Sequence, residues 1–247
     1  MKKIKKLLTV SVLSAGILIS PFHGSNAQAK VLWNGMELVN GQIGRVTILK
    51  DTELYKLQGD KKVYSKTLKA GSVYRIYTFK PGMLGLGGEY YVDRDDRVKY
   101  ETPSKTKLNQ VKMEQLFRGV KIGMSPSQIK KLETAKFLQQ ENADGTKTLV
   151  YSTSLFGHDA FLVYGFKNEK LAFFGYSFDP EQKYTSDQLT TIYNNLKQQL
   201  TNIFENQYEQ SDSNKGYPPT LIFQKDHLII SLSYDAEGLV VTVSSAN

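Results

Sequence analysis

The hydrophobic and polar positions of the chain follow two different patterns, one in each half. Between residues 31 and 100, short runs of β-branched and aromatic residues are separated by Gly, Pro and Asp, which is the pattern of short strands joined by turns. It predicts five strands, at 46–49, 52–55, 63–68, 73–77 and 89–92. Five short strands in about 70 residues favour a small, all-β barrel.

The second half predicts helices alternating with strands. Ser125-Pro126-Ser127-Gln128 contains the residues of a capping box and predicts a helix that runs to Lys136. A second capping box, from Thr185 to Gln188, opens a stretch with apolar residues every three or four positions, which predicts one continuous helix over Thr185–Tyr208. Strands are predicted at 148–152, 160–166 and 171–178 after the first helix, and at 220–224, 228–234 and 239–244 after the second. The order helix-β-β-β therefore occurs twice, which predicts an α+β domain with an antiparallel sheet and suggests an internal duplication.

The first 29 residues have the order of a secretory signal peptide. Four lysines precede an apolar stretch from Leu7 to Ile19, and Ala27-Gln28-Ala29 places small residues where a signal peptidase cleaves. The apolar stretch is too short to be a stable membrane anchor. We therefore expect a protein that begins at Lys30, is secreted, and acts extracellularly or at the cell wall, with no membrane span after cleavage.

These patterns predict four segments along the chain. They are a signal peptide at 1–29, a β-barrel at 37–105, a polar connector at 106–112 and an α+β domain at 113–247.

Composition narrows the classes of partner. The chain has 32 Lys and Arg against 24 Asp and Glu, but four of the lysines lie in the predicted signal peptide, so the remaining chain carries only +4. This charge does not call for a nucleic-acid partner, although it is compatible with weak attraction to an anionic wall or membrane surface. The chain has no cysteine, which excludes disulfides, thiol catalysis and cysteine-ligated metals.

The residues that carry chemistry form no catalytic or metal-binding motif. His158 and His227 each adjoin an aspartate, but neither has a third ligand at metal spacing, so we interpret both as hairpin-end residues. The glycine-rich segment 82–88 precedes a predicted strand and not a helix, so we predict a long hairpin loop there, which could also form the lip of a ligand groove, and no phosphate site. The Asp93–Asp96 cluster lacks the glycine and glutamate of an EF-hand and is predicted to be a solvated turn. We expect no catalytic residue, no metal and no cofactor.

Aromatic residues supply the candidate binding site. The first half contains nine of them, more than a barrel of this size can bury, and tyrosine suits a groove for peptide or sugar because it joins apolar area to a polar tip. The predicted contact residues are Tyr74, Tyr77, Tyr90 and Tyr91.

Four stretches in the first half resemble a known module, the bacterial SH3-like module of secreted and cell-wall proteins of Gram-positive bacilli. They are Gly41–Lys50, Leu54-Tyr55, Thr67–Tyr77 and Gly87–Val92. The most specific part is Leu68-Lys69-Ala70-Gly71-Ser72-Val73-Tyr74, which leads into a strand. The resemblance covers about residues 37–105. Such modules commonly bind peptidoglycan or pack beside another extracellular domain. The chain lacks the Trp-rich final strand of better-known wall-binding modules, since its only Trp is Trp33.

The second half resembles binding proteins in outline. Phe117–Ser125 and Leu155–Ala160 are similar to secreted domains of unknown role in the same bacteria. The Gly-Met-Ser helix start, followed by strands, is also similar to the small lipoprotein subunit of outer-membrane barrel assembly and to β-lactamase inhibitory protein. These are binding proteins without catalysis, and the resemblance transfers no site residue.

The leading hypothesis from the sequence is a secreted, non-catalytic binding protein of the cell envelope, with peptidoglycan as the expected ligand. The alternative is a secreted inhibitor or accessory protein that binds another extracellular protein through the C-terminal sheet, because Phe173, Phe174, Tyr176 and Phe178 cannot all face one side of it. A third hypothesis is a wall-glycan hydrolase, which would need two facing carboxylates, with Glu89 as the residue to watch. The sequence determines neither the ligand nor the oligomeric state.

Overall fold

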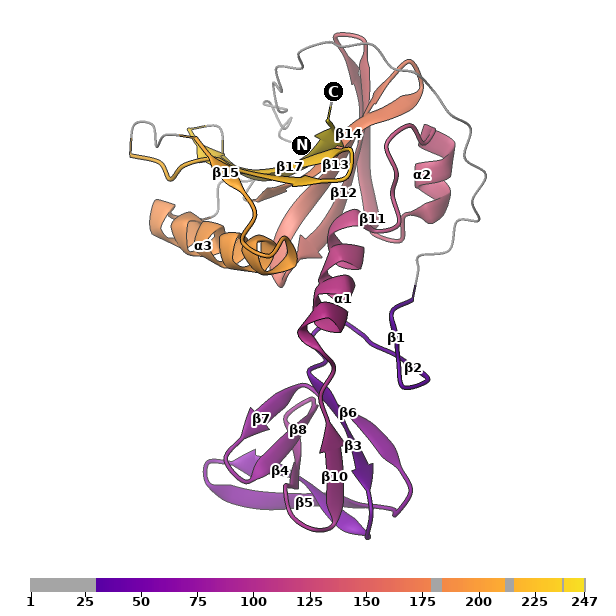
Figure 1. Cartoon of the computed structure of the whole chain (residues 1–247), viewed down its shortest axis with the longest axis vertical. Helices are drawn as coiled ribbons and strands as arrows, with labels where there is room; N and C mark the ends of the chain where they lie inside the picture. The colour runs from indigo at the N-terminus through magenta and orange to yellow at the C-terminus, as the bar shows by residue number, and fades with distance from the viewer. Residues whose placement is uncertain (1–29, 179–183, 212–215, 237, 247) are drawn as a thin grey trace. The chain divides into compact units, whose positions relative to one another are not determined.

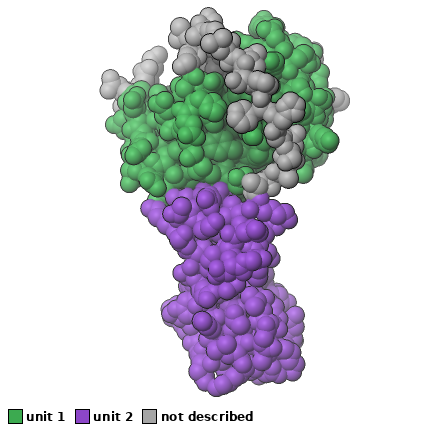
Figure 2. Space-filling model, turned by 45° about the vertical axis from the view of Figure 1, so that its right-hand side comes forward, with its two compact units in different colours: residues 1–29, 113–247 green, residues 30–112 purple. Residues whose placement is uncertain are grey.

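The computed structural model describes residues 30–178, 184–211, 216–236 and 238–246. The predicted signal peptide, residues 1–29, lies outside the described residues. The described chain divides into two compact units, residues 30–112 (the N-terminal unit) and residues 113–247 (the C-terminal unit; Figure 2). Helix α1 (Lys105–Phe117) includes the predicted connector 106–112 and contains the boundary between the units.

The N-terminal unit consists of antiparallel strands (Figure 1). A short hairpin, β1 and β2, precedes a three-stranded sheet of order β10-β3-β6 and a five-stranded sheet of order β5-β4-β9-β8-β7. Its strands are β1 (Leu32–Trp33), β2 (Met36–Glu37), β3 (Gly44–Ile48), β4 (Thr52–Gln58), β5 (Lys61–Leu68), β6 (Val73–Ile76), β7 (Thr78–Lys80), β8 (Met83–Gly87), β9 (Tyr90–Asp93) and β10 (Val98–Glu101). All five strands predicted in this half are present.

One apolar cluster holds the two larger sheets of this unit together. Alternate positions of β3 are buried, because successive side chains of a strand point to opposite faces. The cluster comprises Val46, Ile48, Leu54, Leu68, Ile76, Leu84, Val92 and Val98.

The prediction of a hairpin loop at 82–88 is wrong, because most of this segment is strand β8. Leu84 belongs to the apolar cluster and pairs with Val92 of β9. Gly85 is closely packed: a Cβ there would lie 3.1 Å from the Thr78 side chain and 3.3 Å from the Tyr91 ring, so these neighbours would have to shift. The turn begins only at Gly87 and Gly88, where φ is positive.

The C-terminal unit is built around one antiparallel sheet of eight strands (Figure 1). Its helices are α2 (Pro126–Leu132) and α3 (Ser186–Ile203), and the end of α1 also belongs to it. Its strands are β11 (Lys136–Ala143), β12 (Thr146–Leu155), β13 (His158–Lys167), β14 (Lys170–Phe178), β15 (Glu209–Gln210), β16 (Leu221–Lys225), β17 (Leu228–Asp235) and β18 (Gly238–Ser245). The sheet order is β11-β12-β13-β14-β18-β17-β16-β15, so the last strands of the two halves pair with each other.

Each helix of this unit is followed by four strands, where three had been predicted. The additional strands are β11 and the two-residue β15, which occupy the two edges of the sheet. Every residue of β11 is exposed or half-buried, so no alternating apolar pattern marks it. The order of elements is therefore the same after α2 and after α3.

Both predicted capping boxes are confirmed, but both helices end earlier than predicted. Ser125 and Thr185 each accept a hydrogen bond from the backbone N–H of a glutamine three residues on, whose side chain accepts one in return. The expectation of one helix over Thr185–Tyr208 is wrong, because α3 ends at Ile203. Glu205 and Asn206 adopt positive φ angles of 54° and 62°, which end the helix, and Tyr208 reaches the core from the following loop.

The helix after Ser125 was predicted to run to Lys136 but ends at Leu132. Glu133, its C-cap, is in an extended conformation, and Lys136 already begins strand β11.

The core of the C-terminal unit lies between the helices and one face of the sheet. Leu116 of α1, Ile129 of α2 and Leu196 of α3 pack in the same cluster as alternate residues of the central strands. Phe174, Tyr176 and Phe178 are buried there, whereas Phe173 faces the opposite side and is half-buried. Among the described residues, no helix is long and apolar enough to cross a membrane.

Candidate functional site

A hollow on the N-terminal unit brings together two of the four predicted contact residues. It has a volume of about 410 Å³ and lies between the β1–β2 hairpin, β6 and β8. Its lining consists of Met36, Glu37, Val73, Tyr74, Arg75, Tyr77 and Leu86. Two aromatic rings, one acid and one guanidinium thus share one concave surface.

Glycines position the aromatic wall of the hollow. A Cβ on Gly87 would lie 3.2 Å from the Tyr77 ring, and one on Gly41 would lie 3.9 Å from it, so Tyr77 packs directly against glycine backbone on two sides. Both glycines adopt positive φ angles, which most residues avoid. Tyr74 lies on β6 opposite Val46 and packs partly against the apolar cluster. Both rings are therefore held by packing.

A buried glutamine holds the guanidinium of the hollow in place. Gln42 is only 2% exposed, and its amide nitrogen donates to the carbonyl of Gly44. Its side-chain oxygen accepts from Arg75 Nε at 3.1 Å, while Arg75 Nη2 donates to the Glu37 carbonyl at 3.2 Å. The carboxylate of Glu37 lies 3.0 Å from the ammonium of Lys30. Arg75 is therefore fixed by neutral acceptors and has no carboxylate partner in the described structure.

The other two predicted contact residues lie outside the hollow. Tyr90 is on β9, with the Lys56 ammonium 4.6 Å from its ring centroid. Tyr91 has the Lys80 ammonium 4.6 Å from its own ring and stacks on Tyr55 with centroids 6.5 Å apart. The structure thus separates the predicted set into Tyr74 and Tyr77 on one side, and Tyr90 and Tyr91 on the other.

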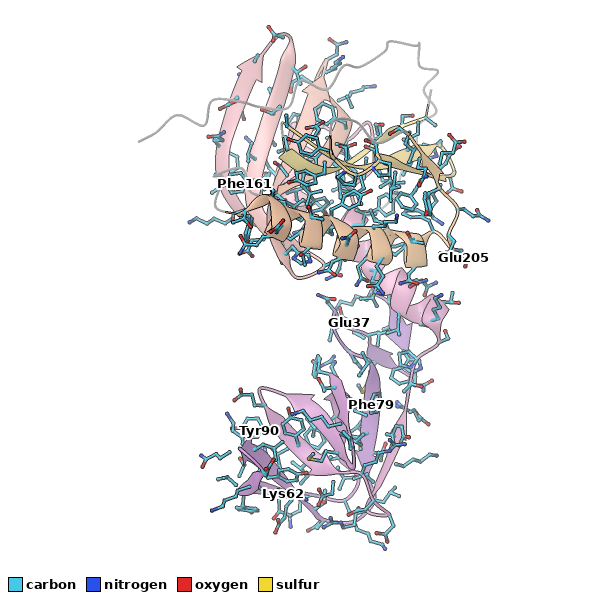
Figure 3. All side chains as sticks on the ribbon, turned by 90° about the vertical axis from the view of Figure 1, so that its left-hand side faces the viewer. Glu37, Lys62, Phe79, Tyr90, Phe161 and Glu205 are labelled. Carbon is cyan, nitrogen blue, oxygen red and sulfur yellow. The ribbon has the colours of Figure 1, made fainter. Side chains whose placement is uncertain are left out.

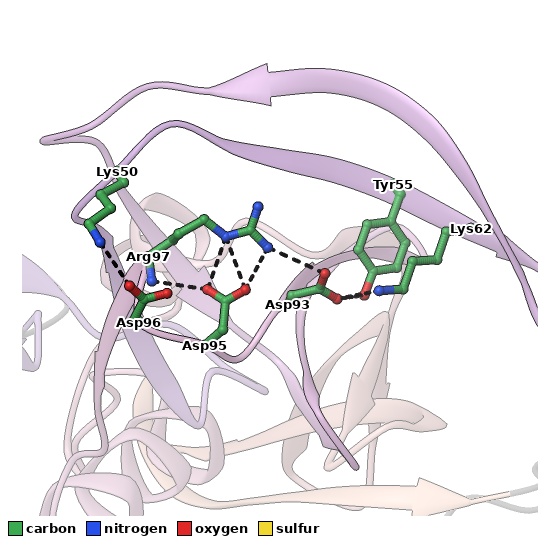
Figure 4. A network of polar contacts seen from close by, with 7 residues as sticks. All are labelled: Lys50, Tyr55, Lys62, Asp93, Asp95, Asp96 and Arg97. Atoms are coloured by element: carbon green, nitrogen blue, oxygen red, sulfur yellow. Dashed lines mark hydrogen bonds and ion pairs between the residues drawn. The ribbon is translucent and has the colours of Figure 1, made fainter.

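The aspartates at 93–96, predicted to be a solvated turn, form a network of ion pairs (Figure 4). Asp93 Oδ1 accepts hydrogen bonds from the Tyr55 hydroxyl at 2.7 Å and from the Lys62 ammonium at 2.6 Å. Arg97 joins Asp93 to Asp95, and the network also includes a pair between Lys50 and Asp96. Burial works to raise the pKa of Asp93, but hydrogen bonds from Lys62 and Tyr55 outweigh it and lower that pKa. The network ties β4 and β5 to the end of β9.

A buried ion pair in the C-terminal unit was not found from the sequence. Arg118, just after α1, lies with its guanidinium 2.5 Å and 2.9 Å from the two carboxylate oxygens of Glu133. The Glu133 side chain is only 2% exposed, and it also accepts from the Tyr164 hydroxyl at 2.7 Å and the Ala135 N–H at 2.7 Å. Four donors therefore satisfy one buried carboxylate, so this group is a structural tie between α1, α2 and β13.

Electrostatics keep that pair charged. Burial works to raise the pKa of Glu133, but hydrogen bonds from Arg118, the Ala135 backbone and Tyr164 bring it below its ordinary value. Burial also works to lower the pKa of Arg118, and its bond to Glu133 raises it. Burial and the negative charge of Glu133 raise the pKa of Tyr164, which remains a hydrogen-bond donor.

The residues considered for hydrolysis or metal binding, Glu89, His158 and His227, lie in three separate elements. Glu89 lies in the β8–β9 turn, and its side chain is 86% exposed, with Lys56 4.0 Å away. His158 begins β13, where burial lowers its pKa, and His227 lies in the turn between β16 and β17. Within the described ranges, no three His, Cys, Asp or Glu side chains are grouped as metal ligands.

No protein-family model, curated protein or solved structure matches this chain. The family expected from residues 37–105 therefore stays a prediction, and function must be argued from the residues themselves.

Proposed function

We propose that this protein is a secreted, non-catalytic binding protein of the cell envelope that contacts peptidoglycan through an SH3-like barrel formed by its N-terminal unit. The observation that carries the proposal is the hollow in which Tyr74 and Tyr77 face Glu37 and Arg75. Binding sites for small polar ligands combine apolar walls with a few fixed polar groups. A peptide or glycan unit offers both apolar faces for the rings and polar groups for the guanidinium and carboxylate.

The fixed position of Arg75 supports recognition of a polar ligand. A guanidinium that is held by Gln42 and a backbone carbonyl loses little side-chain freedom when it binds. Because it has no carboxylate partner among the described residues, a ligand carboxylate or carbonyl meets an available donor. The α+β domain expected for the C-terminal unit then serves as a second extracellular module without catalysis.

The test is sedimentation with purified peptidoglycan from which other wall polymers have been stripped. Protein purified after expression of the full-length chain is mixed with the polymer, and the bound fraction is measured against concentration. Tyr77→Ala and Tyr74→Ala should each weaken binding about tenfold, since a buried aromatic contact contributes on the order of 1–2 kcal/mol. Tyr64→Ala is the matched control, because Tyr64 is 58% exposed on β5 and does not line the hollow. Trp33 fluorescence checks that each variant remains folded.

If wild-type protein does not sediment while a known wall binder does, the peptidoglycan proposal is wrong. Equal losses for Tyr77→Ala and the Tyr64→Ala control would instead remove the hollow as the site.

A second candidate function rests on the sheet face opposite the helices of the C-terminal unit. Phe173 lies there, directly across from Gly165, and the half-buried Phe161 shares its face. This face fits the alternative of an inhibitor or accessory protein that binds another extracellular protein. A stoichiometric complex in culture medium that is lost in Phe161→Lys would favour it over wall binding.

A further inference from the structure

Charge is distributed unevenly between the two units. Residues 30–112 contain 16 Lys and Arg against nine Asp and Glu, a net charge of +7, whereas residues 113–247 contain 12 against 15, a net charge of −3. The N-terminal unit is therefore strongly basic, although the net charge of the two units together is small.

Part of the excess positive charge lies on one face of the β4–β5 hairpin. Cross-strand pairing places Lys66 opposite Leu54, Val63 opposite Lys56 and Lys61 opposite Gln58. Leu54, Lys56 and Gln58 alternate along β4, and a register shift between Leu54 and Tyr55 adds one residue to β5. Lys61 and Lys66, five positions apart on β5, therefore share one face of the hairpin. We call Lys56, Lys61 and Lys66 the basic row. Tyr90 pairs with Lys56 from the neighbouring strand and adds an aromatic ring to the same face.

On the opposite face of the hairpin, the lysine charge is balanced by an aspartate. Lys62, which points that way, lies 2.6 Å from Asp93 and 4.8 Å from the Tyr55 ring centroid. On the basic row, in contrast, Lys61 and Lys66 form no ion pair with any described residue, and the nearest acid to Lys56 is Glu89 at 4.0 Å. Lys61 and Lys66 therefore carry uncompensated charge on this face, beside the pair formed by Lys56 and Glu89.

The strand that carries the row is open to solvent. β5 is an edge strand, and seven of its eight residues are exposed, including Val63 at 40%. Lysines on such an edge oppose pairing with a second copy of the same basic strand. They attract an anionic chain instead.

We propose that the basic row binds a linear polyanion of repeating phosphate groups, of the kind found as a cell-wall polymer. The row runs for about 13 Å between Lys61 and Lys66, because their partners on β4 are four residues apart at roughly 3.3 Å per residue, with Lys56 between them. A row of this shape follows one extended chain, with the half-buried Tyr90 beside Lys56 at its middle. A membrane is a poorer fit, because the face carries only one exposed large apolar residue, Val63.

This inference rests on the proposed envelope association for the source of the polymer, but it uses a different surface from the hollow. Glu37, in the hollow, and Lys62, on the hairpin, lie at opposite ends of the N-terminal unit in Figure 3. Substitutions can therefore remove binding at one site without affecting the other.

The experiment measures the affinity of the purified full-length protein for inorganic polyphosphate across a range of salt concentrations. Three lysine contacts predict a slope of log K against log salt of about −2, at about −0.7 per contact for a single-stranded polyanion. Lys61→Gln/Lys66→Gln should reduce that slope to about −0.7 and weaken binding at least tenfold at low salt. The matched control is Lys99→Gln/Lys105→Gln, which removes the same charge from exposed positions on β10 and α1 and should weaken binding less than threefold.

Three results would overturn the inference: no binding, equal weakening by both double variants, or tighter binding to phosphatidylglycerol vesicles or oligothymidylate than to polyphosphate. Stripped peptidoglycan separates this site from the hollow. Lys61→Gln/Lys66→Gln should sediment with it normally, whereas Tyr77→Ala should still bind polyphosphate.

Discussion

Replacing Arg118 by methionine tests whether the buried ion pair is a structural tie of the C-terminal unit. Methionine keeps much of the side-chain volume but removes both hydrogen bonds to Glu133, at 2.5 Å and 2.9 Å. The carboxylate, 2% exposed, would then remain buried with only the Ala135 N–H and the Tyr164 hydroxyl as donors. Removing one partner of a buried pair typically costs about 3–5 kcal/mol.

The hydrogen bonds support the same magnitude. Each bond to a charged group contributes about 1.5–3 kcal/mol, so the loss of two gives about 3–6 kcal/mol before the structure relaxes. Urea denaturation, followed by circular dichroism at 222 nm, measures the change. With a slope of about 2 kcal/mol/M, the transition midpoint should fall by about 2 M. Lys147→Met is the matched control, because the Lys147–Glu169 pair lies at the surface and should contribute less than about 1 kcal/mol.

The pH dependence gives this prediction a definite sign. Hydrogen bonds hold the pKa of Glu133 in the folded protein below its ordinary value, so its stabilising contribution is complete above the unfolded pKa of about 4.3 and is lost as the pH falls through the folded pKa. In Arg118→Met, burial acts without the arginine and raises the pKa of Glu133. Lowering the pH then protonates the carboxylate, which removes the cost of burying an unpaired charge in the variant. The difference in unfolding free energy between wild type and variant should therefore be largest at pH 7 and shrink towards pH 4.

A double variant supplies the outcome that would refute this reasoning. In Arg118→Met/Glu133→Gln, the buried charge is gone and the glutamine oxygen still accepts a hydrogen bond, so the loss should be smaller than for Arg118→Met alone. A double variant at least as unstable as the single one, together with a pH-independent difference, would show that Arg118 acts by packing and not by its charge.

Three further predictions concern the sheet and the helix starts of the C-terminal unit. Gly165→Ala places a Cβ 2.3 Å from the Phe173 ring and should cost about 1–3 kcal/mol, with partial rescue by Phe173→Ala; no rescue in thermal denaturation would contradict the contact. Gly175→Ala meets the Val241 carbonyl oxygen at 2.5 Å, which is backbone, so it should cost more than Gly165→Ala; an equal or smaller loss would contradict this. Ser125→Ala and Thr185→Ala should each lower stability by about 1 kcal/mol, and by only a few tenths when glycine is used; identical losses would argue against the caps.

Local signals in the sequence predicted element starts better than element ends. The capping boxes at Ser125 and Thr185 were found because they depend on residues three positions apart. The end of α3 was placed too late because Tyr208 continues the apolar spacing of the helix. It packs on Phe223, with ring centroids 5.5 Å apart, but from a chain that has already left the helix. Apolar spacing in a sequence indicates which residues are buried. It can continue past the end of a helix when the following loop also packs against the core.

Non-local pairing explains the elements that were missed. Strand β11 is held by its pairing with β12 and contributes little to the core, so its sequence carries no alternation. Segment 82–88 appeared to be a loop because glycine favours turns, whereas Gly85 is there to admit the Tyr91 ring. In both cases the deciding interaction comes from another strand, which a local pattern does not contain.

The candidate site was predictable by residue type but not by arrangement. An excess of tyrosine indicated a binding surface, yet nothing in the spacing of Tyr74, Tyr77, Tyr90 and Tyr91 separates the pair in the hollow from the pair beneath lysines. Arg75 was not singled out, because its role depends on Gln42, 33 residues earlier in the chain. The basic row was likewise hidden, since its face is defined by the pairing of β4 with β5.

Two weak sites on one small unit would suit a polymeric wall better than one strong site. The hollow offers two rings and one fixed guanidinium, and the basic row offers three exposed lysines, so neither alone provides the buried area of a tight complex. If both ligands belong to the same wall, binding at one site raises the effective concentration of the other ligand, and the combined affinity exceeds either alone. The salt dependence would then come from the row, and the dependence on glycan and peptide chemistry from the hollow. A protein with the hollow intact but the row removed should accordingly bind whole walls with a weaker salt dependence than the wild type.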